Sequence, residues 1–135
     1  MVTTILGSCV SVCMWDPVIR IGGINHYLLP LWNGEGLPTP KYGNVAIAKL
    51  TKKMISLGSR KRNLRAKVFG GASMNKGSKG LLNVGQRNIM VVNDTLEDEG
   101  IPIVGSDTGG NLGRKLLFFT ETGIVRVRVI KQSKG

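Results

Sequence analysis

The sequence predicts an α/β fold in which two helices pack on a mixed β-sheet. Two segments have the apolar spacing of amphipathic helices, and at least six shorter segments have the alternation or the β-branched composition of strands. Predicted hairpins lie at both ends of the chain, with the helices between runs of strands. This order favours a sheet with helices packed on it.

Length and composition fit one globular domain. The 135 residues fall within the usual size of a single domain. Apolar residues make up 41% and charged residues 20%, which argues against disorder and against a coiled coil. Glycine is the outlier: 19 glycines are about twice the average usage of roughly 7%. This excess indicates many tight turns and close backbone approaches.

The first third of the chain predicts two strands and a loop. Residues 10–14 alternate as a strand does, and Asp16-Pro17 indicates a turn because proline presets φ at the second turn position. Residues 21–29 follow as a second strand, interrupted by Gly22-Gly23. Residues 30–40 contain three prolines and two glycines and are predicted to form a loop.

The rest of the chain predicts two helices among further strands. The first helix has an apolar stripe of Ile47, Leu50, Met54 and Leu57 and ends at Gly58. The second spans 84–99, with Ile89, Val92 and Leu96 on one face and Gly100 at its end. The other predicted elements are strands over 64–69 and 101–104, a Gly/Lys-rich loop after Ser73, a loop over 105–113, and a hairpin of 116–120 and 124–130.

The charge balance indicates an acidic partner. There are 19 Lys and Arg against 8 Asp and Glu, a net charge of +11. Nucleic acid, an anionic membrane surface and an acidic protein face all remain open on charge alone. The densest basic stretch is 59–67, which contains Arg60, Lys61 and Arg62.

The counts of metal-ligating and sulfur-bearing residues exclude several classes. With one His and two Cys, a zinc site of about four ligands is not expected, nor is a disulfide framework. No apolar run approaches the roughly 18 residues that cross a bilayer, and the N-terminus does not read as a signal peptide. These features predict a cytoplasmic protein with two free thiols and no membrane insertion.

The only histidine, His26, is predicted to lie across a hairpin from Cys9. If residues 16–19 form a tight turn, the numbers of paired residues sum to 35 and Cys9 faces His26. Directly opposed residues have Cβ atoms roughly 4.5–5.5 Å apart, within reach of a thiol–imidazole hydrogen bond. The same register gives three further pairs: Trp15 with Arg20, Cys13 with Gly22, and Ser11 with Ile24.

Cys9 also has a suitable local setting for a nucleophile. It follows Gly7-Ser8, where the backbone can turn sharply and expose N–H groups, and a Cys beside a His is readily activated as a thiolate. A chain reversal at Gly7 would bring Thr3 beside His26, where it could orient the imidazole. The structural alternative stays open, because a buried Cys is usually an inert small hydrophobe. Cys13, which alternates within a strand, is expected to pack in that way.

Several motifs occur in an order that is typical of one family. Near the N-terminus they are Thr3-x-x-x-Gly7-Ser8-Cys9-Val10-x-Val12, Asp16-Pro17, and Gly22-Gly23-x-Asn25-His26-x-x-Leu29-Pro30. Downstream they are Gly70-Gly71-Ala72-Ser73-Met74, Asn83-Val84-Gly85-x-Arg87-Asn88, and Asp107-x-Gly109-Gly110-Asn111-x-Gly113-Arg114. Over nearly the whole chain this set resembles the CheD family, the chemoreceptor glutamine deamidases of bacterial and archaeal chemotaxis.

The resemblance implies a fold and an activity. The fold is a three-layer α/β/β sandwich with mixed sheets and two main helices, formed here by a single domain over 1–135. The activity is hydrolysis of receptor glutamines to glutamates with release of ammonia, and cleavage of receptor methyl esters is also attributed to the family. Chemoreceptors and the CheC phosphatase are the implied partners. Family members carry a further N-terminal strand before the Thr-to-Cys motif, which is expected to be missing here because the chain begins two residues before Thr3.

The resemblance also assigns the site residues. Cys9, His26 and Thr3 correspond to the catalytic residues, and no metal or organic cofactor is expected. In the hypothetical mechanism, Cys9 forms a thioester with the glutamine side chain and N–H groups around Gly7 and Ser8 stabilise the oxyanion. Ser73 is expected to contact the substrate or the catalytic groups.

Two other function classes are alternatives. A basic nucleic-acid-binding module fits the net charge of +11, but aromatic residues are only 5% and no nucleic-acid-binding motif is present. A non-catalytic regulator of CheC would bind without deamidating. Because chemoreceptor bundles are generally acidic, the family resemblance suggests that Arg60, Lys61 and Arg62 form a receptor-docking face.

Overall fold

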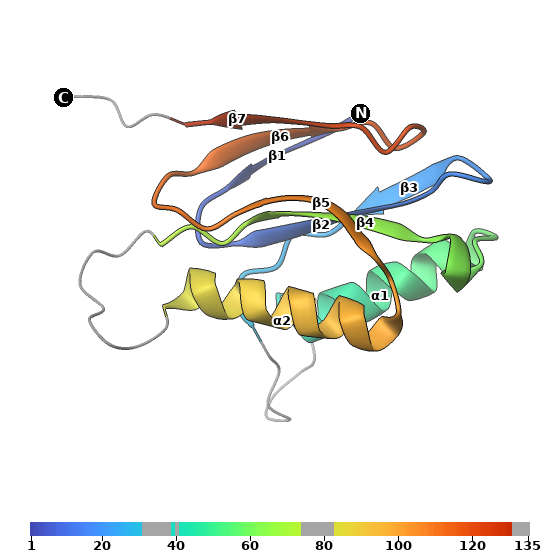
Figure 1. The fold of residues 1–135 in the computed structure, drawn as a ribbon, viewed down its shortest axis with the longest axis horizontal. Coiled ribbons are helices and arrows are strands. Elements are labelled where there is room, and N and C mark those ends of the chain that lie inside the picture. The colour runs from blue at the N-terminus through green and yellow to red at the C-terminus, as the bar shows by residue number, and fades with distance from the viewer. Residues whose placement is uncertain (31–38, 40, 74–82, 131–135) are drawn as a thin grey trace.

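The computed structural model describes residues 1–30, 39, 41–73 and 83–130, and they form three layers (Figure 1). Helices α1 (Gly43–Ser56) and α2 (Val84–Glu99) form one outer layer. The middle layer is a four-stranded sheet, here called the inner sheet, and the third layer is a three-stranded outer sheet. The predicted three-layer α/β/β sandwich with two main helices is confirmed. Most of the loop predicted over 30–40 and the Gly/Lys-rich loop after Ser73 lie outside the described residues.

The inner sheet is mixed and has the order β3-β2-β4-β5. Its strands are β2 (Val10–Asp16), β3 (Ile21–Ile24), β4 (Arg65–Gly70) and β5 (Ile103–Thr108). The β4–β5 pair is parallel and the other pairs are antiparallel. The outer sheet is antiparallel in the order β1-β6-β7, with β1 (Val2–Leu6), β6 (Arg114–Phe118) and β7 (Val125–Val129). A short 3-10 helix, η1 (Lys61–Asn63), precedes β4.

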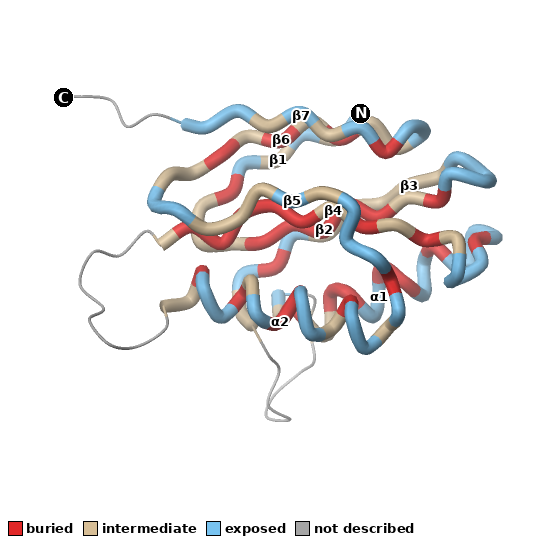
Figure 2. The backbone as a smooth tube through the Cα atoms, viewed as in Figure 1, coloured by how far each residue is buried: buried red, intermediate tan, exposed pale blue. Residues whose placement is uncertain are grey.

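Strand β2 is buried on both faces because it lies between the helices and the outer sheet (Figure 2). Val10, Val12 and Met14 face the helices, where they pack in a core with apolar residues of α1 and α2. Cys13 faces the other way, into a second core between the two sheets. Alternate residues of a strand point to opposite faces, so one strand supplies both cores.

Helix α2 has the predicted bounds, which its end signals explain. Asn83 and Gln86 form a capping box: the Asn83 side chain accepts from Gln86 N at 3.0 Å, and the Gln86 side chain accepts from Asn83 N at 3.1 Å. Gly100 ends the helix in the left-handed conformation. Helix α1 differs from the prediction at its end, because Leu57 lies beyond the helix and is 53% exposed while Ile47, Leu50 and Met54 are buried.

The predicted register of the β2–β3 hairpin is wrong by two residues. Asp16 pairs with Ile21, and Cys13 pairs with Ile24 instead of Gly22, so the numbers of paired residues sum to 37. The turn is longer than predicted because Asp16 Oδ1 accepts from Val18 N at 2.8 Å and Ile19 N at 3.2 Å, and Arg20 takes a left-handed φ of 59°. A shift of two keeps every side chain on its predicted face.

Two further strand boundaries differ from the predictions. Regular pairing of β3 ends at Ile24, and only an isolated bridge between Val10 and Tyr27 continues it. Strand β5 runs on to Thr108, across part of the loop predicted over 105–113. Strand β5 is an edge strand that pairs only with β4. Polar residues are tolerated in an edge strand, although they are not typical of a buried one, which explains why this part was predicted as a loop.

Candidate active site

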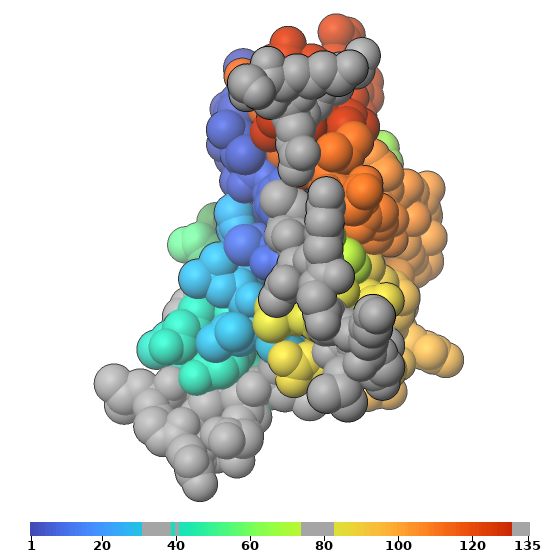
Figure 3. Space-filling model, turned by 90° about the vertical axis from the view of Figure 1, so that its left-hand side faces the viewer, coloured from blue at the N-terminus to red at the C-terminus, as the bar shows by residue number. Residues whose placement is uncertain are grey.

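Cys9 lies in the short connection that crosses from the outer sheet to the inner sheet. Residues 7–9 join β1 to β2, and the chain reverses there as predicted. The connection is fixed to the segment after β4: Gly71 N donates to Cys9 O at 2.8 Å, and Ala72 N donates to Gly7 O at 2.9 Å. Cys9 is half-buried against the core between the sheets. The nucleophile candidate is thus held by main-chain bonds at the edge of a core. Figure 3 shows the N-terminal segment in blue beside the orange strands on this side of the molecule.

His26 follows β3 and faces the outer sheet. Its neighbours fix its position, since Asn25 N donates to Val12 O at 3.1 Å and Tyr27 exchanges two main-chain hydrogen bonds with Val10. The Asn25 side chain replaces a main-chain acceptor in this ladder by accepting from Val12 N at 3.0 Å. The His26 ring is exposed, and its Nδ1 lies 3.0 Å from the Thr4 hydroxyl.

The observed register makes Cys9 and His26 diagonal neighbours on one face. Continuing the pairing of Val10 with Tyr27 places His26 opposite Ser11, so the predicted direct opposition of Cys9 and His26 is corrected. Diagonal neighbours in a regular antiparallel pair have separations of roughly 7–8 Å, which long or ring-bearing side chains can span. No hydrogen bond joins the two side chains among the described residues. Catalytic hydrogen bonds are often long without substrate and tighten when it binds.

Thr4, and not Thr3, makes the threonine contact to His26. Thr4 pairs with Leu116 on the inner face of the outer sheet, where it reaches His26 Nδ1. Thr3 is exposed, because alternate residues of a strand point to opposite faces. The predicted chain reversal therefore brings β1 back to the histidine, but its register selects the neighbouring residue.

Partial desolvation shifts the pKa values of both side chains. Desolvation raises the pKa of the Cys9 thiol, while backbone hydrogen bonds at Cys9 and Gly7 lower it in part. Desolvation also lowers the pKa of His26 below its ordinary value of 6.5. At neutral pH the pair is therefore a thiol and a neutral imidazole, the state in which the imidazole can accept the thiol proton.

Asn88 of α2 joins the cysteine connection to the histidine segment. Its side-chain Nδ2 donates to Ser8 O at 3.0 Å and to Leu28 O at 3.1 Å, and Tyr27 donates its hydroxyl to Asn88 O. Asn88 is fully buried. Asn88 belongs to one of the family motifs, but the sequence predicted no role for it. The available signal was a polar residue on the buried stripe of α2 formed by Gly85, Asn88, Val92 and Leu96.

The glycine-rich motifs pack against the cysteine connection. Gly70 has a φ of +107°, and a Cβ there would lie 2.1 Å from Cys9 O, so only glycine fits. The buried Arg114 guanidinium donates to Gly70 O at 2.7 Å and to Gly109 O at 2.6 Å. Motifs that are far apart in the sequence therefore converge on one support beneath Cys9.

Ser73 lies next to this support. Its N donates to Gly110 O at 2.8 Å, and its Oγ accepts from Asn83 Nδ2 at 2.7 Å at the start of α2. Ser8 contributes its carbonyl to Asn88, and Gly7 contributes its carbonyl to Ala72. Among the residues predicted for the site, the structure brings together Gly7, Ser8, Cys9 and His26, with Ser73 at the border and Thr3 on the outside.

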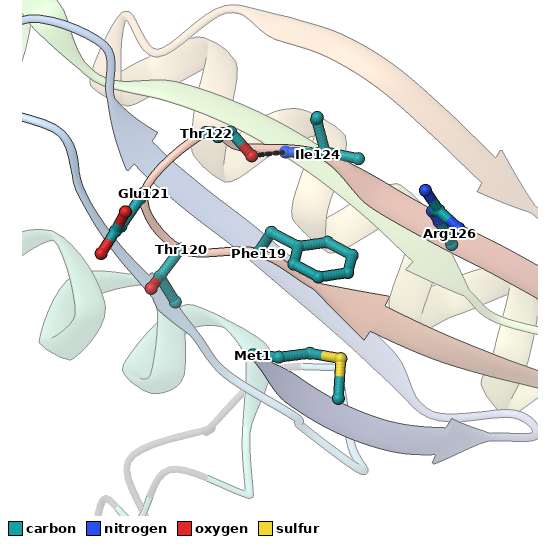
Figure 4. A pocket seen from close by; sticks show the side chains of 7 residues that line it. All are labelled: Met1, Phe119, Thr120, Glu121, Thr122, Ile124 and Arg126. Carbon is teal, nitrogen blue, oxygen red and sulfur yellow. Dashed lines mark hydrogen bonds between the residues drawn. The ribbon is translucent and has the colours of Figure 1, made fainter.

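One of the surface cavities is lined by His26, and the others lie elsewhere. A cavity of about 310 Å³ is lined by His26 together with residues of β3 and α1: Ile24, Asn25, Ala46, Lys49 and Leu50. A hollow of similar volume at the β6–β7 hairpin, lined by Phe119, Arg126 and their neighbours, contains neither Cys9 nor His26 (Figure 4). A third hollow, of about 220 Å³, is lined by Gly7 with residues of β1 and of the loop before β6. The cavity at His26 thus borders the candidate base, and Cys9 lines neither it nor the hollow at Gly7.

The described residues contain neither a metal-binding group nor a membrane-spanning helix. No three His, Cys, Asp or Glu side chains in this part of the chain gather as a metal-binding group. No helix in the same residues is long and apolar enough to cross a membrane.

Comparisons with known proteins agree on one family. A family model described as "CheD chemotactic sensory transduction" matches residues 28–129. A protein of Trichlorobacter lovleyi named "Probable chemoreceptor glutamine deamidase CheD" is 49% identical over 92% of this chain and 77% of its own length. A Sulfurimonas denitrificans protein of the same name is 45% identical over 98% of this chain and 86% of its own, a span that includes Cys9 and His26. A relative in Anaeromyxobacter dehalogenans, named "Probable chemoreceptor glutamine deamidase CheD 1", is 42% identical over 94% of this chain.

Proposed function

The chain belongs to the CheD family, and on that premise we propose that it hydrolyses glutamine side-chain amides of chemoreceptors to glutamate and ammonia. The names of the relatives support the reaction and the substrate class. The observation that supports the roles of Cys9 and His26 is that Cys9 packs against the core between the sheets, while His26 Nδ1 lies 3.0 Å from the Thr4 hydroxyl of the outer sheet. A thiol beside an oriented neutral imidazole is the arrangement of nucleophilic acyl transfer.

The mechanism begins with proton transfer from Cys9 to His26. In the productive tautomer, Nδ1–H donates to the Thr4 hydroxyl, so that Nε2 is free to accept the thiol proton. The thiolate attacks the carbon of the glutamine carboxamide, and the carbonyl oxygen becomes an oxyanion. Backbone N–H groups of the connection over 7–9 stabilise that oxyanion. Removing one such donor costs roughly 10²–10³ in rate in known enzymes.

The second half of the reaction releases ammonia and then glutamate. His26, now charged, returns its proton to the leaving nitrogen as the C–N bond breaks, which leaves a thioester on Cys9. A water molecule gives a proton to His26 and adds to the thioester carbon, and the C–S bond then breaks. Cys9 recovers its proton from His26, so the enzyme is restored and one water has replaced one ammonia.

The test is incubation with a purified chemoreceptor signalling fragment, comparing the wild type with Cys9→Ala. Replacing an amide nitrogen by oxygen gives a small gain in mass, which tandem mass spectrometry assigns to individual glutamines. We expect this gain with the wild type and none above the enzyme-free control with Cys9→Ala. Deamidation that survives in Cys9→Ala would reject Cys9 as the nucleophile.

We also propose a location and a second partner. Two free cysteines fit a reducing cytoplasm. CheC is proposed as a partner from the family resemblance alone. Co-elution of purified CheC with this chain in size-exclusion chromatography would support that pairing, and separate elution at micromolar concentrations would count against it.

A further inference from the structure

The cavity at His26 is lined by one charged side chain, that of Lys49. It lies along β3, the edge strand of the inner sheet, where α1 packs beside it. Ile24, Ala46 and Leu50 supply aliphatic walls, and Lys49 supplies a cation. A ligand that fits these walls and this charge has a short aliphatic stem that ends in an anion. The side chains of glutamate and aspartate have that chemistry.

Lys49 belongs to a ridge of lysines on α1. Lys49, Lys52 and Lys53 are all exposed, and their spacing of three and four residues places them on one side of the helix. Helix α1 contains no acidic residue. None of the three lysines forms a salt bridge within the described residues, so their charges are available to a partner. We call these three residues the lysine ridge.

The neighbouring helix carries the opposite charge. Helix α2 packs beside α1 in the same layer (Figure 1), and its C-terminal half presents Asp94, Glu97, Asp98 and Glu99. An acidic partner is repelled by this part of α2 and attracted by the lysine ridge. The helix layer therefore directs an acidic segment toward the side on which His26 lies.

The densest basic stretch of the sequence lies elsewhere. Arg60 precedes η1 and Arg62 lies within it, before Arg65, which pairs with Trp15 near the hairpin end of β2. Cys9 precedes the other end of β2, roughly 20 Å away along the strand. Lys61 is already paired with Glu99. This stretch is thus remote from Cys9 and provides a charge-matched control for Lys49.

We propose that the lysine ridge recognises acidic residues that flank the reacting glutamine, with Lys49 pairing to a substrate carboxylate in the cavity at His26. The proposal rests on the proposed deamidase function and adds a substrate preference to it. The carboxylate stem packs against Ile24, Ala46 and Leu50, while Lys52 and Lys53 attract acidic residues further along the substrate chain.

The test uses two synthetic peptides that each contain one glutamine. In the acidic peptide, glutamates flank the glutamine; in the neutral peptide, serines replace those glutamates. The readout is the ratio of kcat/KM for the acidic peptide to kcat/KM for the neutral one. The variants are Lys49→Gln and Lys49→Glu in the cavity, and Arg62→Gln as the control that removes one remote charge.

We expect the wild type to prefer the acidic peptide and Lys49→Gln to lower the ratio roughly two- to fivefold, the effect of one exposed ion pair. Lys49→Glu lowers it further because like charges repel, and Arg62→Gln leaves it at the wild-type value. Raising the salt from about 0.01 M to about 1 M, which shortens the Debye length from about 30 Å to about 3 Å, removes the preference. A wild-type ratio near one, or an equal loss in Arg62→Gln and Lys49→Gln, overturns the proposal.

A binding measurement separates this proposal from the deamidase function. If the wild type converts neither peptide, the proposed function fails, and fluorescence anisotropy with labelled peptides and the Cys9→Ala variant decides the recognition question. Tighter binding of the acidic peptide that is lost when Lys49→Gln is added supports the lysine ridge. Equal binding of both peptides rejects it.

Discussion

Cys9 and Cys13 are four residues apart in one continuous stretch and point to the same side, yet their surroundings differ. Cys13 is fully buried in the middle of β2, and desolvation raises the pKa of its thiol to about 12 even though the charge of Lys67 opposes the shift. Cys9 lies just before β2, half-buried, where backbone hydrogen bonds offset part of the burial. The same side chain is thus a packing group within the strand and a nucleophile candidate at its end.

The difference comes from what surrounds each sulfur. Within β2 the main-chain groups are used by β3 and β4, so a thiolate at Cys13 has no free donors and little solvent. At the end of β2 the chain turns, and the neighbouring segments bring an imidazole, a threonine and an asparagine to the same place. Position in the fold therefore decides the chemistry, and four changes test this contrast between the two cysteines.

The largest effect is expected from His26→Gln, which removes the base from the Cys9 end. General base catalysis contributes roughly 10²–10⁴-fold, so kcat for deamidation falls by that range. The fold should persist because the His26 ring is exposed. Steady-state kinetics on a receptor fragment measure the loss, and thermal unfolding serves as the control. A variant with wild-type kcat would remove His26 from the mechanism.

The pH dependence of kcat/KM tests the role of His26 as the base in a second way. The imidazole must be neutral to accept a proton, and its pKa lies below the ordinary 6.5, so wild-type kcat/KM falls only as the pH drops below that value. The residual activity of His26→Gln should lack this acid limb. An identical acid limb in both proteins would assign the titration to another group.

The second largest effect is expected from Asn88→Asp, which removes the amide donors that join the two segments. The carbonyls of Ser8 and Leu28 lose their partner, and misplacement of reacting groups by about 1 Å can cost up to 10²-fold in rate. We expect a lower kcat together with slower alkylation of Cys9 by iodoacetamide across the pH range. Both are measured in protein that remains folded.

Asn93→Asp is the matched control for this change. Asn93 lies on the same helix, is exposed, and undergoes the same replacement of amide by carboxyl. It should keep wild-type kcat and wild-type alkylation. If Asn88→Asp lowers only the unfolding temperature, Asn88 is a structural residue and not a positioning residue.

A smaller effect is expected from Thr4→Val, which removes the hydroxyl at His26 Nδ1 while keeping the shape of the side chain. A hydrogen bond of this kind contributes about 0.5–1.5 kcal/mol, so kcat should fall roughly two- to tenfold. Thr3→Val, one residue earlier on the opposite face of β1, should retain wild-type kcat. Kinetics of the two variants side by side decide which threonine orients the histidine, and a loss in Thr3→Val alone would restore the family assignment.

The smallest effect on activity is expected from Cys13→Ala. Deleting one buried atom costs about 1 kcal/mol of unfolding free energy, because the packed core between the sheets cannot fill the gap completely. Chemical denaturation measures this loss, while kcat stays at the wild-type value. Loss of activity without loss of stability would contradict the contrast between the two cysteines.

The parts of the fold that local signals determine were predictable. The capping box of Asn83 and Gln86 and the left-handed Gly100 fix both ends of α2, and the alternation along β2 separates its two faces correctly. The family motifs assigned Cys9 and His26 to one catalytic pair, and that assignment stays a prediction. All of these signals lie in short stretches of sequence.

The parts that depend on tertiary pairing were not predictable. The turn after Asp16 is longer than a tight turn because Arg20 adopts a left-handed φ, which a non-glycine residue rarely does. The contact of Thr4 depends on the register of β1 against β6, and the bridge of Asn88 depends on how α2 lies across two loops. The register of β1 leaves no local pattern in the sequence, and the buried stripe of α2 marks Asn88 as unusual without showing which segments it joins.

Capture of the covalent intermediate tests directly whether Cys9 is the nucleophile. The wild-type protein is mixed with a glutamine peptide and quenched in acid within the first turnover, and the protein is then mapped by mass spectrometry. If Cys9 is the nucleophile, an adduct forms on Cys9 whose mass is that of the peptide less one ammonia, while Cys13 stays unmodified and Cys9→Ala carries no adduct. An adduct on Cys13, or turnover by Cys9→Ala at the wild-type rate, would contradict that role.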